Sequence, residues 1–140
     1  MRVMVFIKEN AESETGVLPD EKILTAMNNY NEALVKAGVM LAGEGLHPSS
    51  KGKRVRFEGG KKTVIDGPFA ETKELIAGFW LWQVKSMDEA MEWLKRAPFD
   101  GGVEIELRQV MENDEITTMT PELKEKNERL RTQVVANAKR

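Results

Sequence analysis

Residues 78–84 read Gly-Phe-Trp-Leu-Trp-Gln-Val, and this stretch decides the fold. In an extended chain Phe79 and Leu81 face one way, whereas Trp80 and Trp82 face the other. An antiparallel strand that is apolar on both sides is typical of a sheet that is buried on both faces. One chain of this size offers too few helices to cover both faces, so we expect a homodimer in which a second copy covers one of them.

The segments around this strand predict an α+β protein. Further strands are expected over residues 2–8, 39–46 and 103–110, where short apolar or alternating runs occur. Helices are expected between Leu18 and Gly38 and between Ser86 and Pro98. Residues 54–57 and 62–65 flank Gly59-Gly60, which predicts a β-hairpin. The order matches a ferredoxin-like split β-α-β fold with an inserted hairpin.

The rest of the chain is less regular. Residues 10–16 predict a polar loop, and residues 70–74 are compatible with either a short helix or irregular structure. A last helix is expected from Thr120 toward Ala138, but its apolar positions are sparse, so we expect it to dock on the protein or a partner. We therefore divide the chain into a domain over residues 1–111 and a mostly helical extension over residues 112–140.

Composition excludes several classes of function. The 140 residues contain no cysteine, which excludes disulfides, zinc fingers, iron–sulfur clusters and thiol catalysis. A net charge of −2 gives no broad basic field, so we expect no direct nucleic-acid or membrane partner. One histidine with carboxylates does not favour a tight transition-metal site, and we expect neither metal nor cofactor. The apolar runs are too short for a membrane span or a signal peptide, which predicts a cytoplasmic protein.

Two residues are the candidates for acid/base chemistry. His47 carries the only side chain whose ordinary titration falls near neutral pH, and it ends a predicted strand before a turn-rich loop. The alternative is a surface histidine packed on Pro48. Asp66 ends the hairpin, where it either stabilises the turn before Gly67 through its own backbone or orients the imidazole of His47.

Three runs of sequence resemble the DGPF branch of the YCII-related family. They are Glu44-Gly45-Leu46-His47-Pro48, the segment Val64-Ile65-Asp66-Gly67-Pro68-Phe69-Ala70-Glu71-Thr72-Lys73-Glu74, and Ala77-Gly78-Phe79-Trp80. The resemblance covers about residues 1–111. It implies a ferredoxin-like chain that dimerises into an α+β barrel, with His47 and Asp66 as a catalytic pair in a cleft. Glu71 and Lys73 are the substrate-binding candidates, unless this mixed-charge cluster is only a solvated face.

Two functions from different classes remain open. The first is an enzyme that acts on a small molecule of unknown identity, with His47 as acid or base and Asp66 orienting it. The second is a non-catalytic ligand-binding or regulatory module that acts with a transcription (sigma) factor, since the resemblance links some family members to sigma factors. A binding module would tolerate His47→Gln, whereas catalysis would not.

Overall fold

The computed structural model describes residues 1–139, without the side chain of Lys73. The chain forms two compact units, Met1–Val110 and Met111–Arg140. The first unit contains, in order, β1 (Arg2–Lys8), α1 (Ala11–Glu14), α2 (Glu21–Lys36), β2 (Met40–Gly45), β3 (Lys53–Glu58), β4 (Lys61–Asp66), β5 (Ile76–Gln83), α3 (Met87–Lys95) and β6 (Ile105–Gln109). Two 3-10 helices, η1 (Ser49–Lys51) and η2 (Thr72–Glu74), flank the β3–β4 hairpin.

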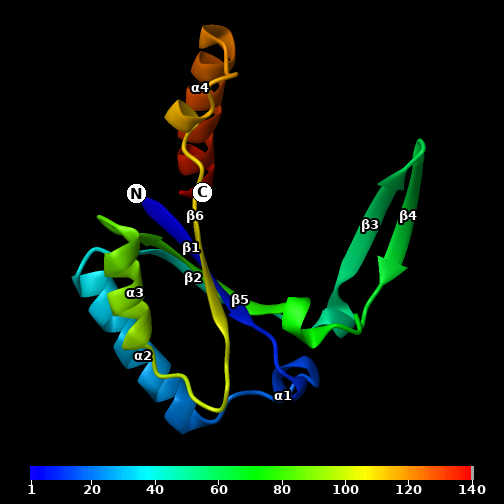
Figure 1. Cartoon of the computed structure of the whole chain (residues 1–140), viewed down its shortest axis with the longest axis vertical. Helices are drawn as coiled ribbons and strands as arrows, with labels where there is room; N and C mark the ends of the chain where they lie inside the picture. The colour runs from blue at the N-terminus through cyan, green and yellow to red at the C-terminus, as the bar shows by residue number, and fades with distance from the viewer. Residues whose placement is uncertain (140) are drawn as a thin grey trace. The chain divides into compact units, whose positions relative to one another are not determined.

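The main sheet has the strand order β2-β5-β1-β6, and each neighbouring pair is antiparallel (Figure 1). This order and the two β-α-β halves confirm the predicted ferredoxin-like fold. Strands β3 and β4 form a separate two-stranded hairpin whose turn holds Gly59 and Gly60 at positive φ. Two glycines in this conformation allow a tight hairpin turn, as their pattern predicted.

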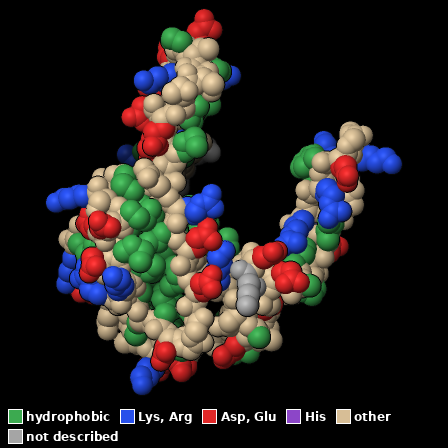
Figure 2. All heavy atoms as spheres, viewed as in Figure 1, with side chains coloured by type: hydrophobic (Ala, Val, Ile, Leu, Met, Phe, Trp, Pro, Cys, Tyr) green, Lys and Arg blue, Asp and Glu red, His purple; other side chains and the backbone are tan. Residues whose placement is uncertain are grey.

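The core lies between one face of the sheet and the helices α2 and α3. Val3 is opposite Trp82 and Val5 is opposite Trp80 in the register, so these four side chains share that face. They are buried together with Leu34 of α2 and Ala90 of α3. Figure 2 shows hydrophobic side chains gathered between α3 and β6. The helices therefore cover the side of the sheet that carries the two tryptophans.

The other face of the sheet is also apolar. Met4 is opposite Leu81 and Phe6 is opposite Phe79, and all four side chains are half-buried. This confirms the prediction that β5 carries apolar side chains on both faces. The homodimer inferred from this pattern stays a prediction.

Tyr30 joins the two helices of the core, because its hydroxyl donates to the Trp93 carbonyl oxygen at 2.6 Å. Burial raises the pKa of Tyr30 to about 12, and the Arg96 cation opposes this shift. A raised pKa means that Tyr30 stabilises the fold fully below pH 10, and that this stabilisation is lost as pH rises through 12.

We therefore expect Tyr30→Phe to lower the free energy of unfolding by about 0.5–1.5 kcal/mol at pH 7, because one hydrogen bond is lost while the Arg96 amide still donates to the Trp93 carbonyl oxygen. Absorbance of the tyrosinate reports Tyr30 directly, because it is the chain's single tyrosine. Denaturant unfolding at pH 10 and pH 12 should show a smaller alkaline loss in Tyr30→Phe than in the wild type. Equal losses in both proteins would contradict the assignment.

One loop segment is ordered differently from the expectation, and a second, for which two structures were possible, forms the short helix. The predicted polar loop over residues 10–16 contains α1, whose start is capped reciprocally by Asn10 and Ser13. A helix of one turn is too short to show a hydrophobic period, so the pattern did not reveal it. Residues 72–74 of the undecided segment form η2.

The second unit consists of η3 (Asn113–Glu115) and α4 (Pro121–Ala138). Thr120 caps α4 by accepting a hydrogen bond from the Leu123 amide, and Pro121 occupies the first turn. Within the unit, the Asn113 amide donates to Asn127 Oδ1 at 2.6 Å, which ties η3 to α4. The predicted helix is present, and its docking on the first unit or a partner remains a prediction.

Candidate functional site

The topology brings Glu9 and His47 to one edge of the sheet. Strands β1 and β2 both run antiparallel to β5, so their carboxyl-terminal ends point to the same edge. Glu9 directly follows β1, and His47 follows β2 by two residues. Backbone hydrogen bonds connect both segments to the start of β5. Glu9 N–H donates to the Leu75 carbonyl oxygen, and Leu46 N–H donates to the Ala77 carbonyl oxygen.

Two adjoining cavities meet at this edge, and we call them together the His47 hollow. They have volumes of about 280 and 420 Å³, and both are lined by Glu9, Leu46 and His47. The smaller cavity extends toward the hairpin, past Ser49 and Lys53. The larger one extends toward α1 and the segment before α2. His47 is exposed and makes no hydrogen bond within the described part of the chain. Its imidazole is therefore free to meet a ligand.

Glu9 is the buried carboxylate of this site, and the sequence analysis missed it. Only 7% of Glu9 is exposed, and its Oε2 accepts a hydrogen bond from the Ser13 hydroxyl at 2.6 Å. The burial depends on α1, which the sequence pattern did not predict. One signal was available, since Glu9 is an acidic residue at the end of an apolar strand that runs parallel to the strand before His47.

Ser49 holds the loop after His47 against the base of the hairpin, and we call this contact the Ser49 clasp (Ser49, Gly52, Gly67 and Phe69). Ser49 Oγ donates to Glu14 of α1 and accepts from the Phe69 amide at 2.9 Å. Gly67 N–H donates to the Gly52 carbonyl oxygen at 3.0 Å, and a Cβ on Gly67 would overlap with the Ser49 carbonyl. The Gly67 and Phe69 positions of the DGPF segment therefore close the loop that carries His47.

Asp66 is bonded to a different partner from the one expected. Its Oδ1 accepts from the Lys53 ammonium at 2.6 Å, and both side chains are 70% exposed. Asp66 lines neither cavity of the His47 hollow, whereas Lys53 lines the smaller one. Within the described residues no hydrogen bond joins His47 to Asp66. The catalytic pairing of these two residues stays a prediction; Lys53, which pairs with Asp66, lines the same cavity as His47.

The two substrate-binding candidates lie at η2, because Glu71 directly precedes this helix and Lys73 belongs to it. Glu71 is exposed at the start of this helix, its carbonyl oxygen accepts from the Glu74 amide at 3.0 Å, and it does not line the His47 hollow. The side chain of Lys73 lies outside the described residues. Neither assignment is tested by this geometry.

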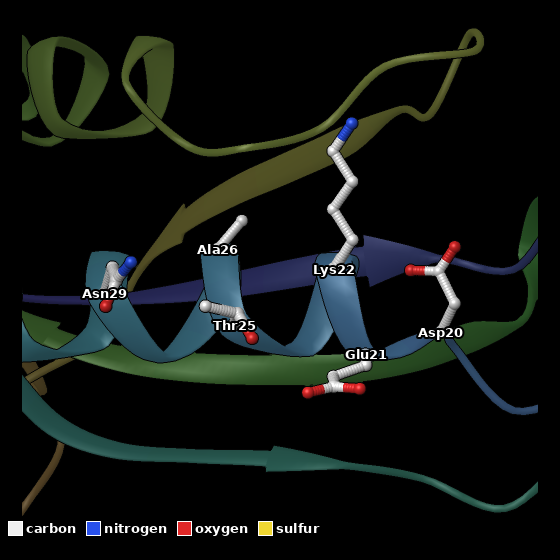
Figure 3. Close-up of a pocket in the computed structure, with 6 residues that line it drawn as sticks. All are labelled: Asp20, Glu21, Lys22, Thr25, Ala26 and Asn29. Carbon is white, nitrogen blue, oxygen red and sulfur yellow. The ribbon is translucent and has the colours of Figure 1, made fainter.

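A larger depression of about 650 Å³ lies along α2 and is not a comparable site. Its lining consists of Asp20 and five residues of α2, and Figure 3 shows these side chains along this one helix. No second element contributes a converging group. Over residues 1–139, apart from Lys73, no three metal-ligating side chains come together, and no helix is long and apolar enough to cross a membrane.

The fold and the hollow define a small ferredoxin-like α+β protein with cavities at one sheet edge. The model of the YCII-related domain matches residues 1–114, so the chain belongs to the YCII-related family. This confirms the family resemblance seen in the motifs. An uncharacterised protein of Rhizobium meliloti (strain 1021) is 31% identical over 93 residues, which cover 66% of this chain and 75% of that protein.

A solved structure is also similar to this chain. It is the 5-chloro-2-hydroxyhydroquinone dehydrochlorinase of Burkholderia phenoliruptrix AC1100 in complex with 2,5-dihydroxybenzoquinone. The match has a TM-score of 0.47 and 17% sequence identity, and it covers 81% of this chain and 97% of that one.

Proposed function

We propose that this protein binds a small organic molecule in the His47 hollow and that His47 is the acid/base group of an enzyme. The observation that carries the proposal is the position of His47, which lines both cavities together with a buried carboxylate. Concave sites with a few converging polar groups are where small ligands bind in proteins. An exposed imidazole without a protein partner can accept or donate a proton once a ligand is in reach.

A fragment screen followed by amide chemical shifts tests the binding step. Fragments that bind should perturb the amides of Leu46, His47 and Leu75. The depression along α2 is a matched control, so the amides of Lys22 and Thr25 should not respond. Fragments that perturb only this control region would contradict the proposal.

The role of the imidazole is tested by His47→Ala and His47→Gln. For an enzyme, both variants should lower turnover of a substrate by about 10²–10⁴-fold, the usual contribution of a positioned acid or base. The dissociation constant should change little. If His47→Gln retains the full function, the protein is a ligand-binding or regulatory module, for which a sigma factor is the partner to test.

Asp66→Asn distinguishes the two roles considered for the Asp66 carboxylate, an exposed ion pair with Lys53 and the orientation of His47. If Asp66 only forms the exposed ion pair with Lys53, the variant should keep its activity and its melting temperature, because such pairs contribute little stability. If Asp66 orients His47 during catalysis, turnover should fall as far as in His47→Ala. We expect Glu9→Gln to impair the site more than Asp66→Asn, because Glu9 borders the same cavities as His47.

A further inference from the structure

Glu9 is a buried carboxylate that forms no ion pair with the side chains that the structure describes, which leave out Lys73. It is more than nine-tenths buried, its Oε2 accepts from the Ser13 hydroxyl, and its Oε1 accepts no hydrogen bond within the described residues. No Lys, Arg or His of the described chain forms an ion pair with it. A buried charge is costly unless a counter-charge and hydrogen bonds satisfy it. Among the described residues no cation is paired with this carboxylate, and the two cations that line the hollow, Lys53 and Arg54, line only its smaller cavity.

An apolar pocket of about 320 Å³ adjoins the larger cavity of the His47 hollow, and we call it the Trp80 pocket. The two share Pro19, Gly45 and Ala77 as lining residues. The apolar walls of the Trp80 pocket come from Ile7, Pro19, Leu24, Met27, Ala77, Phe79 and Trp80. The Trp80 indole N–H donates to Asn31 Oδ1 at 3.0 Å, which holds the ring in place as a wall.

The carboxylates that line the Trp80 pocket and the larger cavity are not balanced by a lysine or arginine of the described residues. Among the described residues that line the Trp80 pocket and the larger cavity there is no lysine and no arginine, whereas Glu9 and Glu44 are present. In these two spaces an anionic ligand would meet the two carboxylates and no lysine or arginine of the described residues. A cationic head group would be attracted, since opposite charges stabilise each other most strongly where water is excluded.

We propose that the Trp80 pocket and the larger cavity of the His47 hollow together bind a protonated primary amine with an apolar, ring-sized body. The ammonium group lies at Glu9 Oε1, and the body lies against Trp80 and Met27. This inference rests on the proposed function, because it names the substrate class of the same hollow. It also gives Glu9 a role in recognition that leaves acid/base chemistry to His47.

Three probes with the same ring and different head groups test the proposal: 2-phenylethylamine, 2-phenylethanol and phenylacetate. Binding is followed through the Trp80 indole N–H and the His47 ring signals in NMR spectra. We expect the amine to bind at least tenfold more tightly than the alcohol, and phenylacetate to bind weakest. Glu9→Gln keeps the size of the side chain and its contact with Ser13, and it should remove the preference for the amine.

Gly45→Val provides a second variant that blocks the passage between the two cavities. A Cβ on Gly45 would meet no atom within 4 Å, so we expect the exposed strand end to accept valine without a fall in melting temperature. Amine binding should weaken at least tenfold.

The proposal is overturned if the alcohol or phenylacetate binds as tightly as the amine, or if Glu9→Gln keeps the preference. In those cases a response of the His47 signals would still support the proposed function. The proposal is also overturned if none of the three probes perturbs Trp80, and the fragment screen then decides the proposed function separately.

Discussion

Gly67→Ala is expected to remove ligand binding at the His47 hollow and to destabilise the first unit by about 3 kcal/mol. The added methyl group would overlap with the Ser49 carbonyl, which belongs to the backbone and cannot rotate away. The hairpin base and the loop after His47 must then separate, and overpacking of this kind costs about 1–3 kcal/mol or somewhat more. Separation also removes the donor of the Gly52 carbonyl oxygen, which Gly67 N–H supplies.

Hydrogen exchange and thermal unfolding measure both parts of this effect. The Phe69 amide, which donates to Ser49 Oγ, should lose its protection, and the melting temperature should fall by about 10 °C. Gly45→Ala is the matched control, because a Cβ at Gly45 meets nothing within 4 Å. If Gly67→Ala melts with the wild type and keeps the Phe69 amide protected, the Ser49 clasp does not hold the loop.

Leu81→Asp is expected to convert a homodimer into a monomer. We propose that two copies associate through the sheet face that carries Met4, Phe6, Phe79 and Leu81, since both long helices of the first unit lie on the other face. A stable interface buries well over about 1,000 Å² in total, and a carboxylate in its centre would lose its water without gaining a partner.

Light scattering should give twice the chain mass of 15.8 kDa for the wild type and a single chain mass for Leu81→Asp at micromolar concentration. Val35→Asp is the matched control, because Val35 is an apolar residue of α2 that is 61% exposed. This variant should keep the wild-type mass. A wild-type protein that is monomeric at micromolar concentration would refute the homodimer.

Sequence patterns were sufficient for most of the fold, because its strands and long helices carry clear periods and caps. The pairing of Asp66 with Lys53 could also have been predicted from the sequence. A tight turn centred on Gly59 and Gly60 places Lys53 directly opposite Asp66, as the register shows. A lysine at that position competes with the more distant His47 for the Asp66 carboxylate. The predicted hairpin register therefore already indicated the Lys53 pairing.

The centre of the site was harder to predict, for physical reasons. The burial of Glu9 arises when α1 folds over the end of β1, and one helical turn leaves no hydrophobic period in the sequence. The roles of Gly67 and Phe69 depend on a close approach between segments that are almost 20 residues apart. A motif can mark such residues as important, but only the packing around them shows that they close a loop.

The β3–β4 hairpin also gives the molecule an uneven distribution of charge. Residues 51–66 contain six basic and two acidic residues, a net charge of +4, whereas the rest of the chain carries −6. Eleven of the twelve residues in the two strands are exposed, and Figure 2 shows Lys and Arg side chains along them. Since residues 111–140 carry no net charge, the first unit is an electric dipole, although its net charge is only −2. In dilute buffer its field orients approaching charged molecules, and at physiological ionic strength screening confines this effect to about 8 Å.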